Sequence, residues 1–209
     1  MKDLVIIGAG GMGRTLYDIA RESVGYGEEF TIKGFIDDNP NALDGFENYP
    51  PVLGNISDYV PSENECFSFS IGGETRTACI DNLVAKGAEF INIIHRTARI
   101  GSNVKIGKGN IVAAFTTLGA DCKIGSYNMI QSYTVIGHDA LIGNYNRIDT
   151  HVTCVGGIRV LDEATIHTSA VINHNVTIGN HAKVGACSFV IRKVKDYQTV
   201  FGIPAKKID

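Results

Sequence analysis

Two short segments carry residue types suited to chemistry. In Gly137-His138-Asp139 an imidazole and a carboxylate are adjacent in the chain. Such a pair suits general acid–base chemistry, because the carboxylate can orient the imidazole and stabilise its protonated form. A solvated surface pair is the ordinary alternative. The second segment is the glycine-rich stretch Gly8–Gly13, where backbone N–H groups can approach a phosphate.

The glycine-rich stretch lies in a βαβ pattern. Apolar runs predict buried strands over residues 3–8, 31–36 and 66–71, with a last short strand over 89–92. Helices are expected over residues 15–21 and about 74–86, and the stretch between residues 40 and 64 predicts a loop followed by a short helix. Asp37 and Asp38 end the second strand, where a carboxylate can accept hydrogen bonds from a base or ribose.

This N-terminal region is small for a dinucleotide site. About ninety residues precede the next pattern, roughly half of a full dinucleotide-binding fold. A tight turn that packs helix on strand remains the plain alternative for the glycines. A mononucleotide or nucleotide-sugar pocket fits the available length better than NAD does.

The second half follows a six-residue period. From Ile94 to Val190 every sixth residue is aliphatic, except for the small apolar Cys154. Neither a helix nor a flat strand produces this pattern, whereas a β-solenoid of hexapeptides does. Three six-residue faces make one coil of 18 residues, so residues eighteen apart lie above one another at roughly 4.8 Å. The period predicts about five and a half coils over residues 94–193.

Other positions of the repeat have structural roles. Asn110, Asn128 and Asn146 are eighteen residues apart and are expected to stack as an asparagine ladder that satisfies its own amides. Glycines that follow the aliphatic residues are expected to permit sharp corners: Gly101, Gly107, Gly119, Gly125, Gly137, Gly143, Gly179 and Gly185.

Composition excludes several classes of function. Residues 1–90 hold 6 Lys and Arg against 15 Asp and Glu, whereas residues 91–209 hold 13 against 7. The basic half favours a small polyanion, but it lacks the aromatic and arginine pattern of a nucleic-acid binder. No apolar stretch approaches the ~20 residues of a membrane helix. The N-terminus does not read as a signal peptide, and the five cysteines form no CxxC pair, so we expect a cytoplasmic protein with reduced thiols.

The repeat Ile-Gly-x-x-Ala/Val-x resembles the hexapeptide acyltransferases. With the glycine loop, the segment Gly34–Pro40, Ser70-Ile-Gly-Gly and His95-Arg-Thr-Ala98, it is similar to the subfamily that acetylates UDP-amino sugars or sialic acid. The resemblance implies a Rossmann-like α/β domain over residues 1–92 that binds the nucleotide sugar. It implies an all-β left-handed parallel β-helix over residues 93–209 that carries out acyl transfer. It also implies acetyl-CoA as co-substrate, no metal, and a homotrimer with active sites between neighbours.

The same resemblance assigns site residues. His138 is the general base and Asp139 raises its basicity. Gly156, eighteen residues after His138, offers a backbone N–H to the thioester oxygen. Arg147 stands where relatives often have a His near the cofactor, and Gln131 where they often carry an Asn. The remaining residues of the acetyl-CoA groove are Thr168, Ala186, Pro204 and Lys206. The substrate side comprises Gly10, Gly11, Met12, Asp37, Asp38 and Gly72.

Three other functions are compatible with parts of the pattern. A metal enzyme like the γ-class carbonic anhydrases shares the solenoid, and His138 and His174 lie two coils apart, but that family's third His falls on Gly179. A solenoid that binds nucleotide sugars without catalysis would not need the His138-Asp139 pair. An NAD oxidoreductase is disfavoured by the short N-terminal region.

Overall fold

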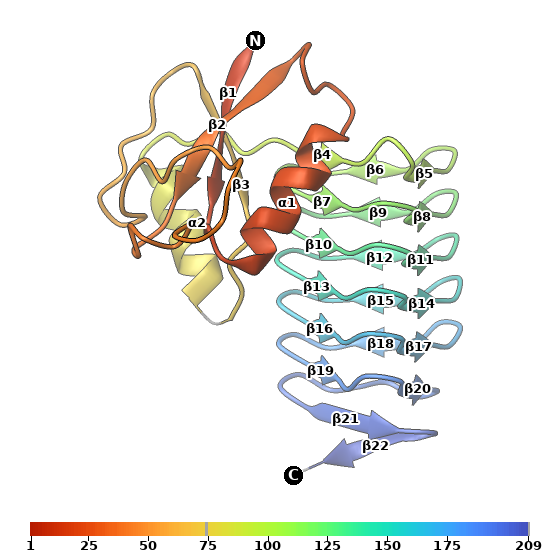
Figure 1. Cartoon of the computed structure of the whole chain (residues 1–209). Coiled ribbons are helices and arrows are strands. Elements are labelled where there is room, and N and C mark those ends of the chain that lie inside the picture. Colours follow the sequence, from red (N-terminus) through yellow and green to blue (C-terminus); the bar gives the residue numbers. More distant parts are fainter. Residues whose placement is uncertain (74, 209) are drawn as a thin grey trace. The chain divides into compact units, whose positions relative to one another are not determined.

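The computed structural model describes residues 1–73 and 75–208, and the chain divides into two units, Met1–Ile94 and His95–Asp209. The first unit contains the parallel sheet β2–β1–β3 (Figure 1). The strands are β1 (Lys2–Ile7), β2 (Phe30–Ile36) and β3 (Glu65–Phe69), the helices are α1 (Gly11–Arg21) and α2 (Thr75–Ala85), and β4 (Ile93–Ile94) ends the unit.

The N-terminal unit has the expected α/β class with several local differences. Helix α1 begins four residues earlier than predicted, directly after Gly10. Residue 74, the expected start of the second helix, lies outside the described residues. Segment 89–92 forms only an isolated bridge between Phe90 and Phe67. The prediction of a short helix before residue 64 is wrong. Gly54 and Pro61 leave too few residues between them for a stable helix, and a single turn forms there.

A buried carboxylate ties the loop before β3 to the sheet. Glu65 is 3% exposed. Its Oε1 accepts hydrogen bonds from Lys33 Nζ and the Tyr59 hydroxyl, both at 2.7 Å, and its Oε2 accepts from the Ser62 N–H at 2.9 Å. Burial by itself raises the pKa of Glu65, but these donors outweigh it and hold that pKa below its usual value.

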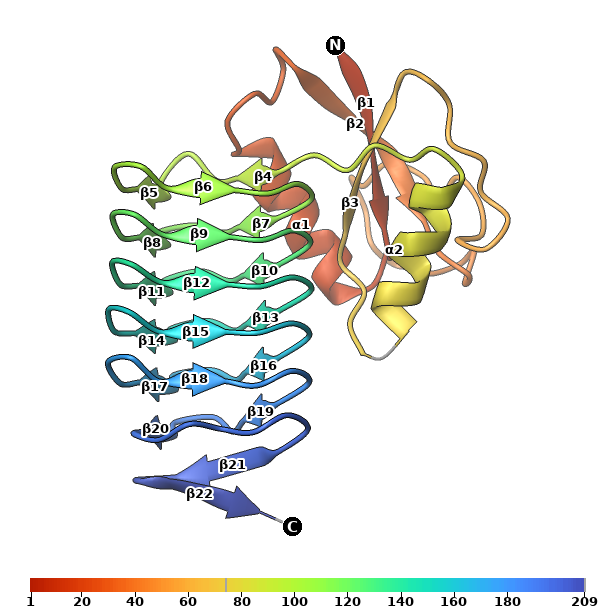
Figure 2. The ribbon, with the colours of Figure 1, turned by 180° about the vertical axis from the view of Figure 1, so that it is seen from behind.

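The second unit is a parallel β-solenoid with three faces (Figures 1 and 2). Face 1 has the order β22–β21–β19–β16–β13–β10–β7, face 2 has β20–β17–β14–β11–β8–β5, and face 3 has β18–β15–β12–β9–β6. The face 1 strands are β7 (Ile111–Val112), β10 (Met129–Ile130), β13 (Arg147–Ile148), β16 (Thr165–Ile166), β19 (Lys183–Val184), β21 (Thr199–Gly202) and β22 (Ala205–Ile208).

The other two faces consist of two-residue strands. Face 2 contains β5 (Arg99–Ile100), β8 (Thr117–Leu118), β11 (Val135–Ile136), β14 (Thr153–Cys154), β17 (Val171–Ile172) and β20 (Phe189–Val190). Face 3 contains β6 (Lys105–Ile106), β9 (Lys123–Ile124), β12 (Leu141–Ile142), β15 (Arg159–Val160) and β18 (Thr177–Ile178). We call the corners between consecutive faces corner 1–2, corner 2–3 and corner 3–1.

The six-residue ladder is the core of the solenoid. Partners in neighbouring coils are eighteen residues apart, as Ile130 and Ile148 on face 1 illustrate. Ladder residues such as Ile136 and Ile166 are fully buried. Each buried aliphatic side chain contributes on the order of 1.5–3 kcal/mol. The predicted fold class, a Rossmann-like domain followed by a hexapeptide solenoid, is confirmed.

The corner glycines serve a different purpose from the one predicted. Gly119 and Gly137 do not have positive φ angles; the left-handed conformation falls two residues later, on residues such as Asp121 (φ 62°) and Asp139 (φ 55°). A Cβ at Gly119 would lie 2.6 Å from the backbone nitrogen of His138 in the next coil. Close approach between coils, rather than backbone freedom, therefore demands glycine there.

The asparagine ladder is confirmed. The Asn110 side-chain oxygen accepts from the backbone N–H of Asn128 at 3.0 Å and also from its side-chain amide at 3.0 Å. The Asn128 oxygen accepts from the Asn146 N–H at 2.8 Å. The ladder ends at Asn146, whose side-chain oxygen accepts from the Ala164 N–H at 2.8 Å and whose amide nitrogen has no partner in the described parts of the chain.

An antiparallel hairpin of β21 and β22 ends the solenoid. β21 pairs with β19, and the ring of Phe201 packs where a side chain at Gly185 would otherwise lie. The hairpin thereby extends face 1 beyond β19 and makes β22 the edge strand of that face. Within residues 1–73 and 75–208, no helix has the length and apolar character required to cross a bilayer.

The Glu65→Gln variant should be less stable than the wild type by about 1–3 kcal/mol at neutral pH, since it loses hydrogen bonds to a charged group. Because the folded-state pKa of Glu65 is lowered, its contribution is complete above the unfolded-state pKa and disappears as the pH falls through the folded-state value. Urea unfolding at a series of pH values measures this, with the exposed neighbour Glu63→Gln as control. A stability difference that stays constant into acid would contradict the assignment.

Candidate functional site

His138 and Asp139 form a hydrogen-bonded pair at corner 2–3. The His138 Nδ1 lies 2.6 Å from Asp139 Oδ2, and the two side chains are 66% and 65% exposed. An ionised carboxylate only accepts hydrogen bonds, so Nδ1 carries the proton and Nε2 has the free lone pair. The left-handed backbone of Asp139 places its carboxylate beside the preceding imidazole. The pair can therefore take up a proton at Nε2.

Gly156 lies directly above the His138 imidazole in the next coil. A Cβ at Gly156 would be 2.5 Å from His138 Nε2 and 2.7 Å from Cε1. The carbonyl of His138 accepts from the Gly157 N–H at 2.9 Å, which fixes the two coils against each other. With the imidazole in this orientation, only glycine leaves room for it at position 156. The predicted stacking of Gly156 over His138 is what the structure has.

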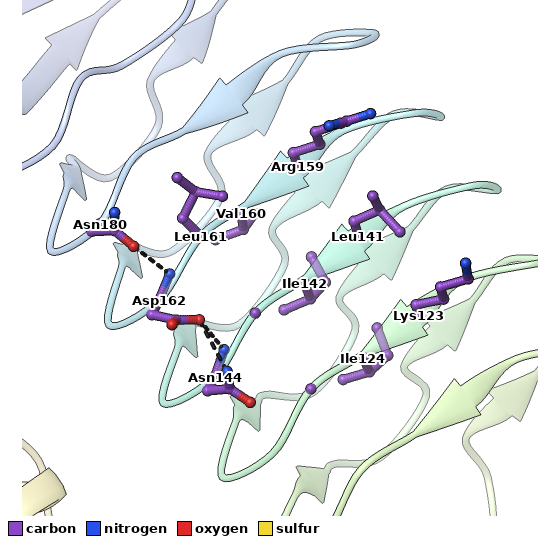
Figure 3. Close-up of a pocket in the computed structure, with 12 residues that line it drawn as sticks. Lys123, Ile124, Leu141, Ile142, Asn144, Arg159, Val160, Leu161, Asp162 and Asn180 are labelled. Atoms are coloured by element: carbon purple, nitrogen blue, oxygen red, sulfur yellow. Dashed lines mark hydrogen bonds between the residues drawn. The ribbon is translucent and has the colours of Figure 1, made fainter.

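The backbone amide of Gly156 has no acceptor among the described residues. At the equivalent places of corner 3–1 the amides are closed by side chains from the next coil. Asp162 Oδ1 accepts from the Asn144 N–H at 2.7 Å, and Asn180 Oδ1 accepts from the Asp162 N–H at 3.1 Å (Figure 3). Buried amides nearly always have an acceptor, so the open amide beside His138 can donate to a bound oxygen.

Corner 1–2 also has open amides of this type. The N–H groups of Thr168 and Ala186, both predicted to line the acetyl-CoA groove, also have no acceptor in the described parts of the chain. Thr168 and Ala186 are exposed and lie one above the other, eighteen residues apart. Pro204 and Lys206 are exposed in the β21–β22 hairpin. In one chain, these residues do not converge on the corner that holds His138.

Arg147 belongs to a cluster that the sequence analysis did not find. Its Nε donates to Asp149 Oδ1 at 2.6 Å, and Gln131 Nε2 donates to the same oxygen at 2.7 Å. His167 Nδ1 lies 3.1 Å from Asp149 Oδ2. One signal was available in the sequence. Gln131, Asp149 and His167 are eighteen residues apart and stand directly after aliphatic residues, where the other two corners usually have glycine.

A groove on face 3 contains none of the predicted site residues. It has a volume of about 470 Å³, and the side chains of Lys123, Leu141 and Arg159 project along it (Figure 3). Its floor is the ladder of aliphatic residues and its rim is the closed corner 3–1. The polar groups of that rim are already used within the protein.

In the N-terminal unit the glycine loop combines close packing with open space. A Cβ at Gly13 would lie 2.0 Å from the Gly8 carbonyl oxygen, so Gly13 is needed for packing of α1 on β1. A Cβ at Gly10 would meet nothing within 4 Å, and one at Gly11 would meet only Arg14, at 3.9 Å. Helix α1 has no side-chain cap at Gly10 and no acidic residue in its first turn. Its N-terminus is therefore open to an anion.

The predicted carboxylates support this loop. Asp37 Oδ2 accepts from the Ala9 N–H at 2.7 Å, and Asp38 Oδ1 accepts from the Ile56 N–H at 3.0 Å. Both carboxylates thus hold loop backbone and retain lone pairs for a ligand. Met12 is half-buried in the first turn of α1, and Gly72 is exposed after β3.

In the parts of the chain that the structure describes, no three His, Cys, Asp or Glu side chains come together as ligands of one ion. His174 is exposed two coils from His138. Burial raises the pKa of the Cys154 thiol to about 12, so this cysteine remains a protonated core residue.

Comparison with known proteins bears on both units. Residues 3–83 match the family described as the PglD N-terminal domain. The acetyltransferase domain of PglB from Neisseria gonorrhoeae FA1090 is 25% identical, with a TM-score of 0.89 over 100% of both chains, and has also been solved with acetyl coenzyme A. PerB from Caulobacter crescentus, solved with CoA and GDP-perosamine, is 26% identical, with a TM-score of 0.89 over 100% of this chain and 98% of that one.

A curated relative matches a shorter segment. Serine acetyltransferase from Bacillus pumilus is 43% identical over 49 residues, which are 23% of this chain and 23% of that protein. The match thus spans about a quarter of the relative's length. The family match and the solved structures confirm the expected resemblance to hexapeptide-repeat sugar acetyltransferases.

The Gly156→Ala variant tests the contact between the glycine and the imidazole. The added methyl group would lie only 2.5 Å from His138 Nε2, so the ring should turn away and its hydrogen bond to Asp139 should be lost. Ala120 fills the same corner place two coils earlier, so the backbone should tolerate alanine. Long-range ¹H–¹⁵N spectra of the imidazole measure the change, with Ser102→Ala at the same corner as control. Unchanged His138 signals in Gly156→Ala would refute the contact.

Proposed function

We propose a reaction for this chain from the premise that it is a hexapeptide-repeat acetyltransferase of the amino-sugar subfamily. It transfers acetyl from acetyl-CoA to an amino group, or a hydroxyl, of a nucleotide-linked amino sugar or sialic acid for bacterial surface-glycan synthesis. CoA and GDP-perosamine in PerB, and acetyl-CoA in the PglB domain, support these two substrates.

The observation that carries the proposal is the His138–Asp139 pair beneath the open amide of Gly156. The lone pair of the acceptor amine or hydroxyl attacks the thioester carbonyl carbon, and His138 Nε2 accepts the proton that this amine or hydroxyl loses. Asp139 keeps Nδ1 protonated and stabilises the imidazolium that forms. The imidazolium then returns the proton to the departing CoA thiolate, so that the products are the acetylated sugar and free CoA.

The Gly156 N–H supplies the second requirement of acyl transfer. Negative charge develops on the thioester oxygen during attack, and a preorganised backbone donor stabilises it. The open amides of Thr168 and Ala186 can donate to the carbonyl groups of an extended pantetheine arm. Lys206 and Arg147 provide positive charge for phosphate and carbonyl oxygens.

The N-terminal unit is proposed to bind the nucleotide part of the sugar substrate. The uncapped N-terminus of α1 and the open space at Gly10 and Gly11 suit a diphosphate. Asp37, Asp38, Met12 and Gly72 surround this loop as further contacts. The proposed division is that residues 1–92 select the acceptor and the solenoid holds the donor and the base.

A homotrimer is part of the proposal. His138 and Gly156 lie at corner 2–3, whereas Thr168 and Ala186 lie at corner 1–2. The two corners are separated by one face of six residues, which would span roughly 20 Å as a fully extended chain. A single chain cannot use both corners on one thioester. Three copies around a threefold axis can bring corner 2–3 of one against corner 1–2 of the next.

The reaction can be tested by release of the CoA thiol from acetyl-CoA across UDP- and dTDP-linked amino sugars, GDP-perosamine and sialic acid. We expect turnover with at least one nucleotide-linked amino sugar and a loss of at least ~10²-fold in kcat for His138→Ala, as expected on removal of a general base. Ser102→Ala is the matched control, because it lies at the same corner without touching the pair.

Three outcomes would count against this function. Equal kcat values for wild type and His138→Ala would remove the assigned base. A complete absence of thiol release with every acceptor, in protein that binds the nucleotide sugar, would favour the binding solenoid without catalysis. Turnover that falls on treatment with a chelator would instead favour the metal enzyme.

The oligomeric state is a separate prediction. Light scattering coupled to size exclusion should give three times the chain mass of 22.5 kDa. Mixing His138→Ala with Ala186→Trp, which fills the other corner, should partly restore activity, since some sites then contain both intact corners. A monomeric mass would refute the shared site.

A further inference from the structure

A second polar cluster lies at corner 1–2 of the solenoid. Gln131, Asp149 and His167 follow strands β10, β13 and β16, which are stacked in three successive coils (Figure 1). The equivalent places before and after them hold Ala113 and Gly185. Small residues therefore satisfy the packing requirement at this corner. The polar residues at the same place in three successive coils need another explanation.

Asp149 is the centre of the cluster. Its side chain is only 7% exposed, and it accepts hydrogen bonds from Arg147 Nε and Gln131 Nε2 on Oδ1. Its Oδ2 faces His167 Nδ1 at 3.1 Å. Because an ionised carboxylate only accepts, the His167 proton is on Nδ1. A buried charge is tolerated when it is paired and hydrogen-bonded, and three neighbouring residues meet that condition.

The cluster leaves nitrogen atoms facing outward. The side chains of Arg147 and His167 are 42% and 44% exposed. Of the nitrogens of these two side chains, Asp149 contacts only Arg147 Nε and His167 Nδ1. In the described parts of the chain, the terminal guanidinium nitrogens and His167 Nε2 have no hydrogen-bond partner. The Thr150 hydroxyl donates to Gln131 Oε1 at 3.2 Å and fixes the orientation of that amide.

We propose that Asp149 is a positioning residue that holds Arg147 and His167 in the orientation needed to bind an oxygen-rich group of the acyl donor. This inference rests on the proposed function, which assigns Arg147 to acetyl-CoA. A free arginine side chain must be ordered when its ligand binds, and this ordering weakens binding. An arginine held at Nε by a buried carboxylate is ordered beforehand and still donates through both terminal nitrogens.

The test compares Asp149→Asn with Asp162→Asn. Both replace a carboxylate that accepts hydrogen bonds from a neighbouring coil, but Asp162 belongs to the closed corner 3–1. In Asp149→Asn we expect the Kd for CoA, by calorimetry, and the KM for acetyl-CoA to rise about tenfold. We expect kcat and the acceptor KM to change less than about threefold. Asp162→Asn should keep the wild-type values.

Two further measurements separate positioning from a general structural role. The His167 Nδ1–H resonance should shift in Asp149→Asn and not in Asp162→Asn. In a double-mutant cycle, Asp149→Asn should add little to the loss of CoA affinity caused by Arg147→Ala, because Asp149 acts through Arg147. Arg147→Lys serves as a second variant in case Asp149→Asn fails to fold. It keeps the positive charge on a half-exposed side chain but lacks Nε, so it should weaken CoA binding to a similar extent.

The outcomes distinguish this inference from the proposed function. Wild-type affinity for CoA in folded Asp149→Asn, or in Arg147→Lys, would overturn the positioning role and leave the acetyltransferase intact. Additive losses in the double-mutant cycle would overturn it as well. A wild-type protein that binds no CoA at all would overturn the proposed function, and the cluster would then be an internal brace of the corner.

Discussion

The structure depends on hydrogen bonding between coils of equal length. Each strand residue on a face pairs with the residue eighteen positions away in the neighbouring coil. Met129, for example, pairs with Ile111 in the preceding coil and with Arg147 in the following coil. An insertion of one residue would turn the aliphatic ladder outward on every later face, because side chains alternate between inside and outside along a strand. Stability and the position of every outward side chain therefore follow from the same repeat.

The equal coils leave chemistry to the corners, and the three corners differ in how their amides are used. Corner 3–1 is closed by a column of Asn and Asp side chains that accept from the amides of the neighbouring coil. Corner 2–3 has an imidazole and an open glycine amide instead. A corner that satisfies itself stabilises the stack, whereas an open corner can bind a substrate.

Corner 1–2 differs from the other two corners because it contains a buried charged residue. A buried carboxylate at Asp149 organises a guanidinium, an amide and an imidazole from three coils. The exposed pair His138–Asp139 has no such support from neighbouring coils. In the proposed homotrimer, a shared site would combine the exposed base of corner 2–3 with the donors that are already held in place at corner 1–2.

The sequence alone determined the repeat, the coil assignment of every residue after Ile94 and the stacking of Gly156 on His138, because a strict period fixes position without any knowledge of contacts. It also gave the βαβ order of the N-terminal unit. It did not give the reason for the corner glycines, the hydrogen bonds of Asp37 to Ala9, or the partners of Asp149. Those depend on which side chains from different coils and loops face one another and on which amides already have acceptors. Only the tertiary structure decides such contacts, because each is set by the space and hydrogen bonds that its neighbours leave.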